Sequence, residues 1–128
     1  MVEPLAGTFD VEAFSSELRG EPDRTIATRI LLENDRVRIW ELRLEPGERA
    51  PFHWHTTTYF FVCVDGGRAR SRFPNGHLIE MDYEVGFTWF TEPTEQQPEI
   101  HDLENIGATL LRFTTVELLT PGRYTVHP

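Results

Sequence analysis

Short hydrophobic segments separated by turn residues occupy most of this chain, and this pattern constrains its fold more than any other feature. After residue 22 no segment keeps the spacing of an amphipathic helix, whereas short apolar runs recur and end at Gly, Pro, Asn or Asp. The expected strands are Thr25–Leu32, Arg36–Leu44, Thr58–Val64, Arg68–Phe73, Leu78–Val85, Phe87–Phe90, Ile100–Asn105 and Thr109–Leu119. Such a series predicts an all-β sandwich or small barrel.

The two ends of the chain fall outside this series. Residues 1–8 predict an irregular arm, and Asp10 can cap a short helix that stops at Gly20. The apolar face of this helix would consist of Val11, Phe14 and Leu18. The expected divisions of the chain are 1–22 for the arm and helix, 23–120 for the barrel and 121–128 for a tail.

One hairpin can be predicted together with its register. Arginines alternate with small or apolar residues before a Pro-Asn-Gly loop, and acidic residues alternate with apolar ones after it. A three-residue loop with Gly76 in the left-handed conformation would place Arg70 opposite Glu80 and Arg68 opposite Asp82. The arginines would then form a neutralised solvent face and not an anion-binding site.

Composition and charge exclude several classes of function. With 128 residues and 39% hydrophobic content, the chain suits one domain with one core. No apolar run approaches the roughly 20 residues of a membrane span. The formal net charge of −9 argues against nucleic acid or an anionic membrane as partner. All 12 basic residues are arginine, which excludes Schiff-base chemistry on lysine, and the single cysteine fits a reducing cytoplasm.

Two histidines one residue apart are the clearest candidates for chemistry. His53 and His55 lie on an extended segment, where side chains two positions apart point to the same face. Imidazole is a common metal ligand, so the pair predicts part of a metal site. His101 is the third candidate, although a lone histidine is more often structural than a ligand.

These residues resemble the two sequence motifs of the cupin superfamily of small β-barrels. The residues that match the spacing of the first motif are Gly47, His53, His55 and Gly66. The residues that match the ends of the second motif are Gly86, His101 and Asn105. Between Gly86 and His101 the chain is longer than the family pattern and carries a polar, proline-bracketed loop at 91–98.

The resemblance implies a single-domain cupin, a double-stranded β-helix or jelly-roll barrel, here with a short N-terminal helix. It also implies that His53, His55 and His101 bind one divalent transition metal as a three-histidine site. Fe(II) is favoured, because several cupin oxygenases have three-histidine iron sites; Zn, Ni, Cu and Mn remain alternatives. Cupins are often homodimers, and the run Thr25–Leu32 is a candidate contact between subunits.

The glutamate of the first motif is missing from this chain. Tyr59 occupies its position, and Phe60 occupies the alternative spacing. We interpret Tyr59 as a barrel-lining aromatic residue whose hydroxyl is hydrogen-bonded. Two alternatives are a catalytic role behind the ligands, in which Tyr59 orients a water or substrate, and direct phenolate ligation, which a pKa near 10 disfavours. Glu99 could supply the missing carboxylate, although it fits an acidic rim better.

The remaining candidates have structural interpretations. We expect Cys63 to be a buried, inert thiol, His77 and His127 to be exposed, and Trp54 to point away from the two flanking histidines. The residues expected in the core are Trp40, Leu42 and Leu44, and also Phe87, Trp89 and Phe90, for which a pocket wall is the alternative.

The sequence therefore leaves three functions open. The first is a mononuclear non-haem metal enzyme, dioxygenase-like, that acts on a small and partly hydrophobic organic molecule. The second is a non-catalytic cupin that binds a small molecule or a metal as a sensor. The third is a metal-dependent lyase or isomerase, which the lack of an evident carboxylate base disfavours.

Overall fold

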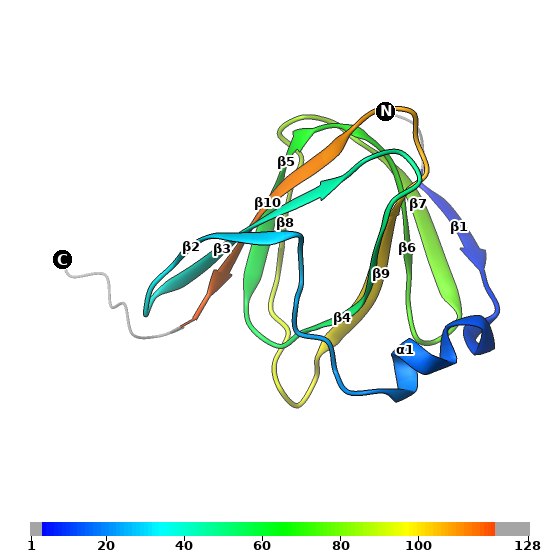
Figure 1. Ribbon diagram of the computed structural model, residues 1–128, viewed down its shortest axis with the longest axis horizontal. Coiled ribbons are helices and arrows are strands. Elements are labelled where there is room, and N and C mark those ends of the chain that lie inside the picture. Colours follow the sequence, from blue (N-terminus) through cyan, green and yellow to red (C-terminus); the bar gives the residue numbers. More distant parts are fainter. Residues whose placement is uncertain (1–3, 120–128) are drawn as a thin grey trace.

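Two five-stranded antiparallel sheets lie face to face in the computed structural model, which describes residues 4–119 (Figure 1). One sheet has the order β1-β7-β6-β9-β4 and the other has the order β2-β3-β10-β5-β8. The strands are β1 (Leu5–Thr8), β2 (Arg29–Glu33), β3 (Val37–Leu44), β4 (Arg49–His55), β5 (Tyr59–Asp65), β6 (Gly67–Arg72), β7 (His77–Tyr83), β8 (Thr88–Thr91), β9 (Glu99–Asn105) and β10 (Leu111–Leu118). The helices are η1 (Val11–Phe14) and α1 (Ser15–Arg19), and neither is long and apolar enough to cross a membrane.

The predicted all-β architecture is confirmed, with two corrections near the N-terminus. The segment expected to be an irregular arm contains β1, which pairs antiparallel with β7 and was too short to show a periodicity. The strand expected at Thr25–Leu32 begins only at Arg29. The proposed tail and His127 lie outside the described residues.

The β6–β7 hairpin has the predicted register. Arg70 lies opposite Glu80 and Arg68 lies opposite Asp82, and their side chains form hydrogen bonds of 2.8 and 3.0 Å. Gly76 has a φ of 89°, the left-handed conformation that the loop required. Because side chains alternate along a strand, the hairpin directs its charges outward and its small and apolar residues toward the opposite sheet.

Helix α1 packs against β4 at one end of this sheet (Figure 1), and the Phe14 ring of η1 lies against the guanidinium group of Arg72 on β6. Asp10 caps η1 as expected, because its carboxylate accepts a hydrogen bond from the Glu12 amide at 3.1 Å. The Phe14 ring packs edge-on against Phe52 of β4. The Arg49 guanidinium lies 4.6 Å from the centre of the Phe14 ring.

Under these helices lies a fully buried carboxylate. Asp102 accepts hydrogen bonds from Arg49 Nε at 2.7 Å and from the backbone amide and Nη1 of Arg72 at 2.7 and 2.9 Å. Nη1 and Nη2 of Arg49 donate hydrogen bonds of 2.9 Å to the two carboxylate oxygens of Glu17. These bonds lower the pKa of Glu17. Glu17 also accepts the Phe52 amide, so α1 is joined to β4, β6 and β9 through one charged network.

The apolar core lies between the two sheets. The expected core residues of β3, Trp40, Leu42 and Leu44, are all buried. They pack in one cluster with residues of the facing and neighbouring strands, among them Cys63, Leu103, Leu111 and Phe113. Trp40 satisfies its indole N–H by donating to Glu117 at 2.7 Å.

Replacing Asp102 with Asn should lower the free energy of unfolding by about 3–5 kcal/mol, because two arginines would keep their charges beside a neutral amide. Urea denaturation followed by far-UV circular dichroism measures the change. Asp82→Asn is the matched control; it breaks the more exposed pair with Arg68 and should lower stability by less than about 1 kcal/mol. Equal losses in the two variants would show that the buried network does not stabilise the fold as described.

Candidate metal centre

A β-bulge positions the first histidine of the cluster. Along the β4–β9 pair, Ala50 lies opposite Leu103, while His53 lies opposite His101, so β4 has one residue more than β9 in this interval. Pro51 lies within the bulge, where the absence of an N–H is tolerated. Because of the extra residue, the side chains of Ala50 and His53 lie on the same face of the sheet.

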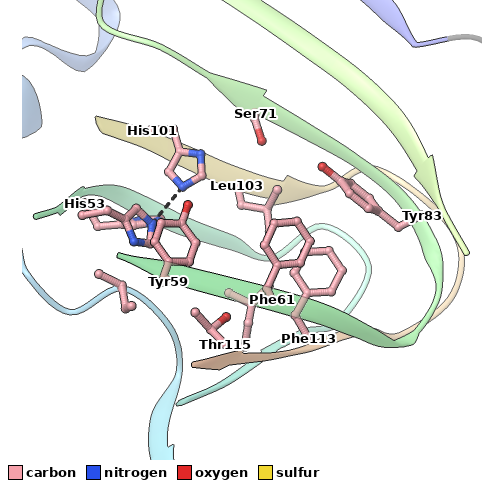
Figure 2. A pocket seen from close by; sticks show the side chains of 12 residues that line it. His53, Tyr59, Phe61, Ser71, Tyr83, His101, Leu103, Phe113 and Thr115 are labelled. Atoms are coloured by element: carbon pink, nitrogen blue, oxygen red, sulfur yellow. Dashed lines mark hydrogen bonds between the residues drawn. The ribbon is translucent and has the colours of Figure 1, made fainter. Parts of the chain in front are cut away.

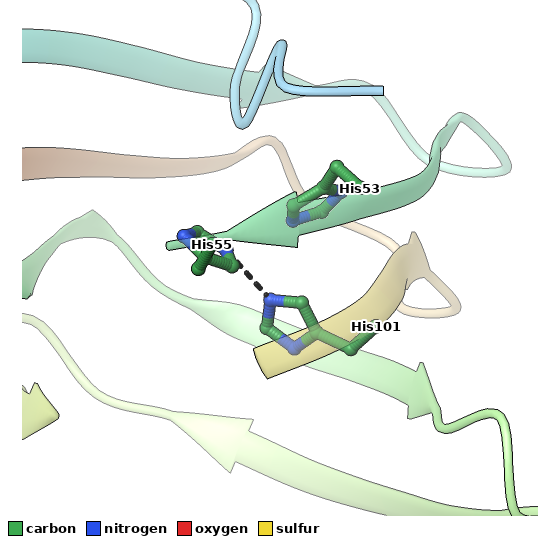
Figure 3. Close-up of side chains that lie close together, drawn as sticks. All are labelled: His53, His55 and His101. Atoms are coloured by element: carbon green, nitrogen blue, oxygen red, sulfur yellow. Dashed lines mark hydrogen bonds between the residues drawn. The ribbon is translucent and has the colours of Figure 1, made fainter. Parts of the chain in front are cut away.

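The three predicted histidines are brought together inside the barrel (Figure 3). One ligand nitrogen from each of His53, His55 and His101 lies within 4.8 Å of the others. His53 and His55 are each 3% exposed, and His55 Nε2 and His101 Nε2 are 3.0 Å apart. Two strands of one sheet therefore build a compact imidazole cluster.

The protonation of the cluster favours metal binding. Burial lowers the pKa of all three histidines, and the neighbouring imidazoles lower the pKa of His55 further, so the rings are neutral at pH 7. Neutral imidazole is the form that binds a metal. His53 Nδ1 donates to the carbonyl oxygen of Pro51 at 2.7 Å, which leaves the Nε2 lone pair of His53 free.

The spacing of the ring nitrogens also fits a cation among these rings. Two nitrogens about 2.1 Å from one ion and at right angles to each other would be about 3.0 Å apart, which is the separation of His55 Nε2 and His101 Nε2. His53, His55 and His101 could therefore hold a metal ion.

Tyr59 lies beside the cluster and is buried, and its hydroxyl is hydrogen-bonded. It is 2% exposed, and its ring stacks on His55 with ring centres 4.1 Å apart. Its hydroxyl donates to Glu99 Oε2 at 2.8 Å, and burial raises the pKa of Tyr59, which disfavours a phenolate ligand. Glu99 is half-buried and lines the large cavity described below, and it is not among the converging ligands. Burial also raises the pKa of Glu99.

Two hollows adjoin the cluster. A cavity of about 50 Å³ lies directly against the histidines, with Tyr59 and His101 toward one end and Phe61, Tyr83 and Phe113 toward the other (Figure 2). A larger cavity of about 410 Å³ shares five of these lining residues and extends between β7 and β8. The shared residues are Tyr59, Phe61, Ser71, Tyr83 and His101.

The remaining candidates divide between the cavity and the surface. Phe87 and Trp89 line the large cavity, and Trp89 and Phe90 are 55% and 53% exposed, so the core placement expected for these two was wrong. Both lie on β8, an edge strand of its sheet, which leaves its residues partly uncovered. Cys63 is buried as expected, and burial raises the pKa of its thiol. His77 is exposed as expected.

Five residues of the cavity wall, all from the β6–β7 hairpin and its loop, were not predicted from the sequence. They are Ser71, Phe73, Ile79, Met81 and Tyr83; the sequence analysis considered only the charged face of this hairpin. The signal was present in the same alternation: the residues between the arginines and between the carboxylates had to face the interior.

Comparisons with known proteins identify the fold. No family model matches the chain, and no curated protein matches it either. Solved structures do match, among them a cupin domain from Bordetella pertussis, with a TM-score of 0.62, 22% identity and coverage of 77% of this chain and 97% of that one. A double-stranded β-helix protein from Klebsiella pneumoniae has a TM-score of 0.57 and 20% identity, covering 91% and 86% of the two chains.

A third solved structure agrees with these two. A cupin-family protein from Methanocaldococcus jannaschii has a TM-score of 0.54 and 20% identity, covering 77% of this chain and 86% of that one. The two-sheet topology and these structural neighbours together show that this chain has the double-stranded β-helix fold of cupin proteins.

Proposed function

We propose that this protein is a metal-dependent enzyme that binds one divalent transition metal through His53, His55 and His101 and acts on a small organic molecule. The observation that carries the proposal is a cluster of three neutral imidazoles, of which two are buried and the third, His101, lines a cavity of about 410 Å³. A cavity of this size fits a small ligand, and its largely apolar lining favours a partly hydrophobic one.

A dioxygenase is the reaction class that this donor set favours. When bound, a metal ion would supply Lewis acidity and, as iron, a redox centre that reacts with oxygen. Imidazole suits Fe, Zn, Ni and Cu better than Mn, and Fe(II) remains the favoured metal.

The residues of the chain would position the ligands and the substrate. The Pro51 carbonyl fixes the orientation and tautomer of His53, and the Tyr59 ring holds His55 by stacking. The Tyr59 hydroxyl and the Glu99 carboxylate form a hydrogen-bonded pair at the cavity wall, two residues along β9 from His101. The aromatic rings around them would exclude water from a bound substrate.

The same Tyr59–Glu99 pair favours a metal-dependent lyase or isomerase as the second candidate. A carboxylate and a phenol that share a hydrogen bond of 2.8 Å beside the histidines are groups that could hold or move a proton of a substrate. Glu99 of this pair is the residue that the sequence already indicated as an alternative source of the missing carboxylate.

We also propose that the protein acts in the cytoplasm as a homodimer. The acidic charge and the buried, unpaired Cys63 fit a reducing compartment without nucleic acid as partner. Strand β2 lies at the edge of its sheet. In an antiparallel contact between the β2 strands of two subunits, Arg29 of one subunit would lie opposite Glu33 of the other. The large apolar side chains exposed on β2 are Ile30, Leu31 and Leu32.

Metal binding is the first test. Untagged protein, analysed by inductively coupled plasma mass spectrometry, should contain close to one transition-metal ion per chain, and His101→Ala should lose it. His77→Ala is the matched control, because His77 is exposed on the β6–β7 hairpin outside the cluster, and this variant should keep the metal. Retention of the metal in His101→Ala would make the ligand assignment wrong.

Oxygen uptake separates the two enzymatic candidates. Iron-reconstituted protein should consume oxygen with at least one member of a panel of diketones, thiols and catechols, and His53→Ala should abolish this consumption. Zinc or nickel as the native metal, with substrate turnover but no oxygen uptake, would favour the lyase or isomerase. Full metal loading without turnover of any panel member would contradict the dioxygenase for these substrate classes.

The dimer has its own test. Leu31→Glu should convert the protein from dimer to monomer in light scattering coupled to size-exclusion chromatography, because the charge would be buried at the β2–β2 contact. Val85→Glu places the same charge on an apolar residue that is 73% exposed far from β2 in the sequence, and it should remain dimeric. A wild-type protein that is monomeric at all concentrations would refute the proposal.

A further inference from the structure

The large cavity has a wall of aromatic rings and no basic side chain among the residues that line it. Its aromatic lining consists of Tyr59, Phe61, Phe73, Tyr83, Phe87 and Trp89. Ile79 and Met81 add apolar surface, and the other lining residues are Ser71, Thr91, Glu99 and His101. None of the arginines between residues 4 and 119 lines this cavity.

The two arginines that flank the lining residue Ser71 form ion pairs on the outer face of the sheet. Arg70 bonds Glu80 at 2.8 Å, and Arg72 bonds Asp102 and Glu104 at 2.9 and 2.8 Å. Because strand side chains alternate, these guanidinium groups lie on the face of β6 opposite to Ser71. An anionic ligand in the cavity would therefore find no guanidinium to pair with.

Among the described residues, Glu99 is the only acidic one in the lining. Its Oε2 accepts the Tyr59 hydroxyl, and Thr91 also interacts with the carboxylate. Carboxylate oxygens each accept more than one hydrogen bond, so a donor on a ligand can still bind Glu99. A negative charge on a ligand would instead be desolvated beside a carboxylate.

We propose that the wall of this cavity favours small aromatic molecules that carry a protonated amine over aromatic carboxylates of similar size. An ammonium group is attracted to the faces of aromatic rings and can donate to Glu99, while the ring of the ligand packs against the aromatic wall. The inference deepens the proposed function, because it names the class of substrate that the enzyme would act on.

Binding to metal-free protein tests the charge selectivity. After treatment with a chelator, the protein is titrated by calorimetry with 2-phenylethylammonium, 2-phenylethanol and 3-phenylpropanoate, three probes of similar size and different charge. The amine should bind about tenfold more tightly than the alcohol, and the carboxylate should bind more weakly than both. The proposal is overturned if the carboxylate binds as tightly as the amine, or if the amine does not bind at its solubility limit.

Two pairs of variants locate the site. Glu99→Gln should reduce the affinity for the amine to that for the alcohol and leave the affinity for the alcohol unchanged. Glu84→Gln, the control, removes the same charge from an exposed position outside the cavity and should change neither affinity. Trp89→Ala should weaken both probes, whereas Phe90→Ala, next to it on β8 but outside the lining, should not. If the two variants of either pair changed the affinities equally, the binding site would lie outside this cavity.

The use of metal-free protein separates this inference from the proposed function. Selective amine binding by a protein that never retains a metal would leave the cavity assignment intact and refute the metal enzyme. If the protein retains a metal through His101 but binds the three probes with equal affinity, the metal site would stand and the charge selectivity of the cavity would be refuted.

Discussion

The buried carboxylate of Asp102 connects the strands that carry the histidines, and the geometry of the cluster depends on this connection. Asp102 follows His101 directly on β9, so the two side chains point to opposite faces of the sheet. On the outer face Asp102 holds Arg49 of β4 and Arg72 of β6. Since a buried carboxylate is stable only with its partners, the spacing of β4, β9 and β6 is restricted at the level where the imidazoles meet.

The bulge in β4 has a second consequence for the same cluster. The extra residue that brings His53 to the inner face also places the Pro51 carbonyl 2.7 Å from His53 Nδ1. A regular strand would have turned the side chain at position 53 away from the side that Ala50 occupies. One local irregularity therefore sets both the direction and the tautomer of a candidate ligand, while the network on the outer face holds the strand that contains it.

The parts of this structure that the sequence predicts are those governed by local patterns. The register of Arg70 opposite Glu80 follows from alternation and one glycine turn, and the convergence of the histidines follows from a short spacing and a family resemblance. The bulge and the burial of Asp102 depend on which strands and helices pack together, and no local pattern contains that information. The exposure of Trp89 likewise depends on β8 being an edge strand.

The exchange of a glutamate for Tyr59 changes where negative charge lies in the barrel. Tyr59 takes the expected position of the carboxylate, and its hydroxyl reaches Glu99, which lies opposite His55 in the β4–β9 register. A carboxylate is thus present near the cluster, but it belongs to the wall of the large cavity and not to the converging ligands. A cation bound by three neutral imidazoles would keep its full charge, because no ligand neutralises it. Glu99 would then place one negative charge in the cavity wall close to this cation, so the charge preference of the wall alone is a property that metal-free protein displays.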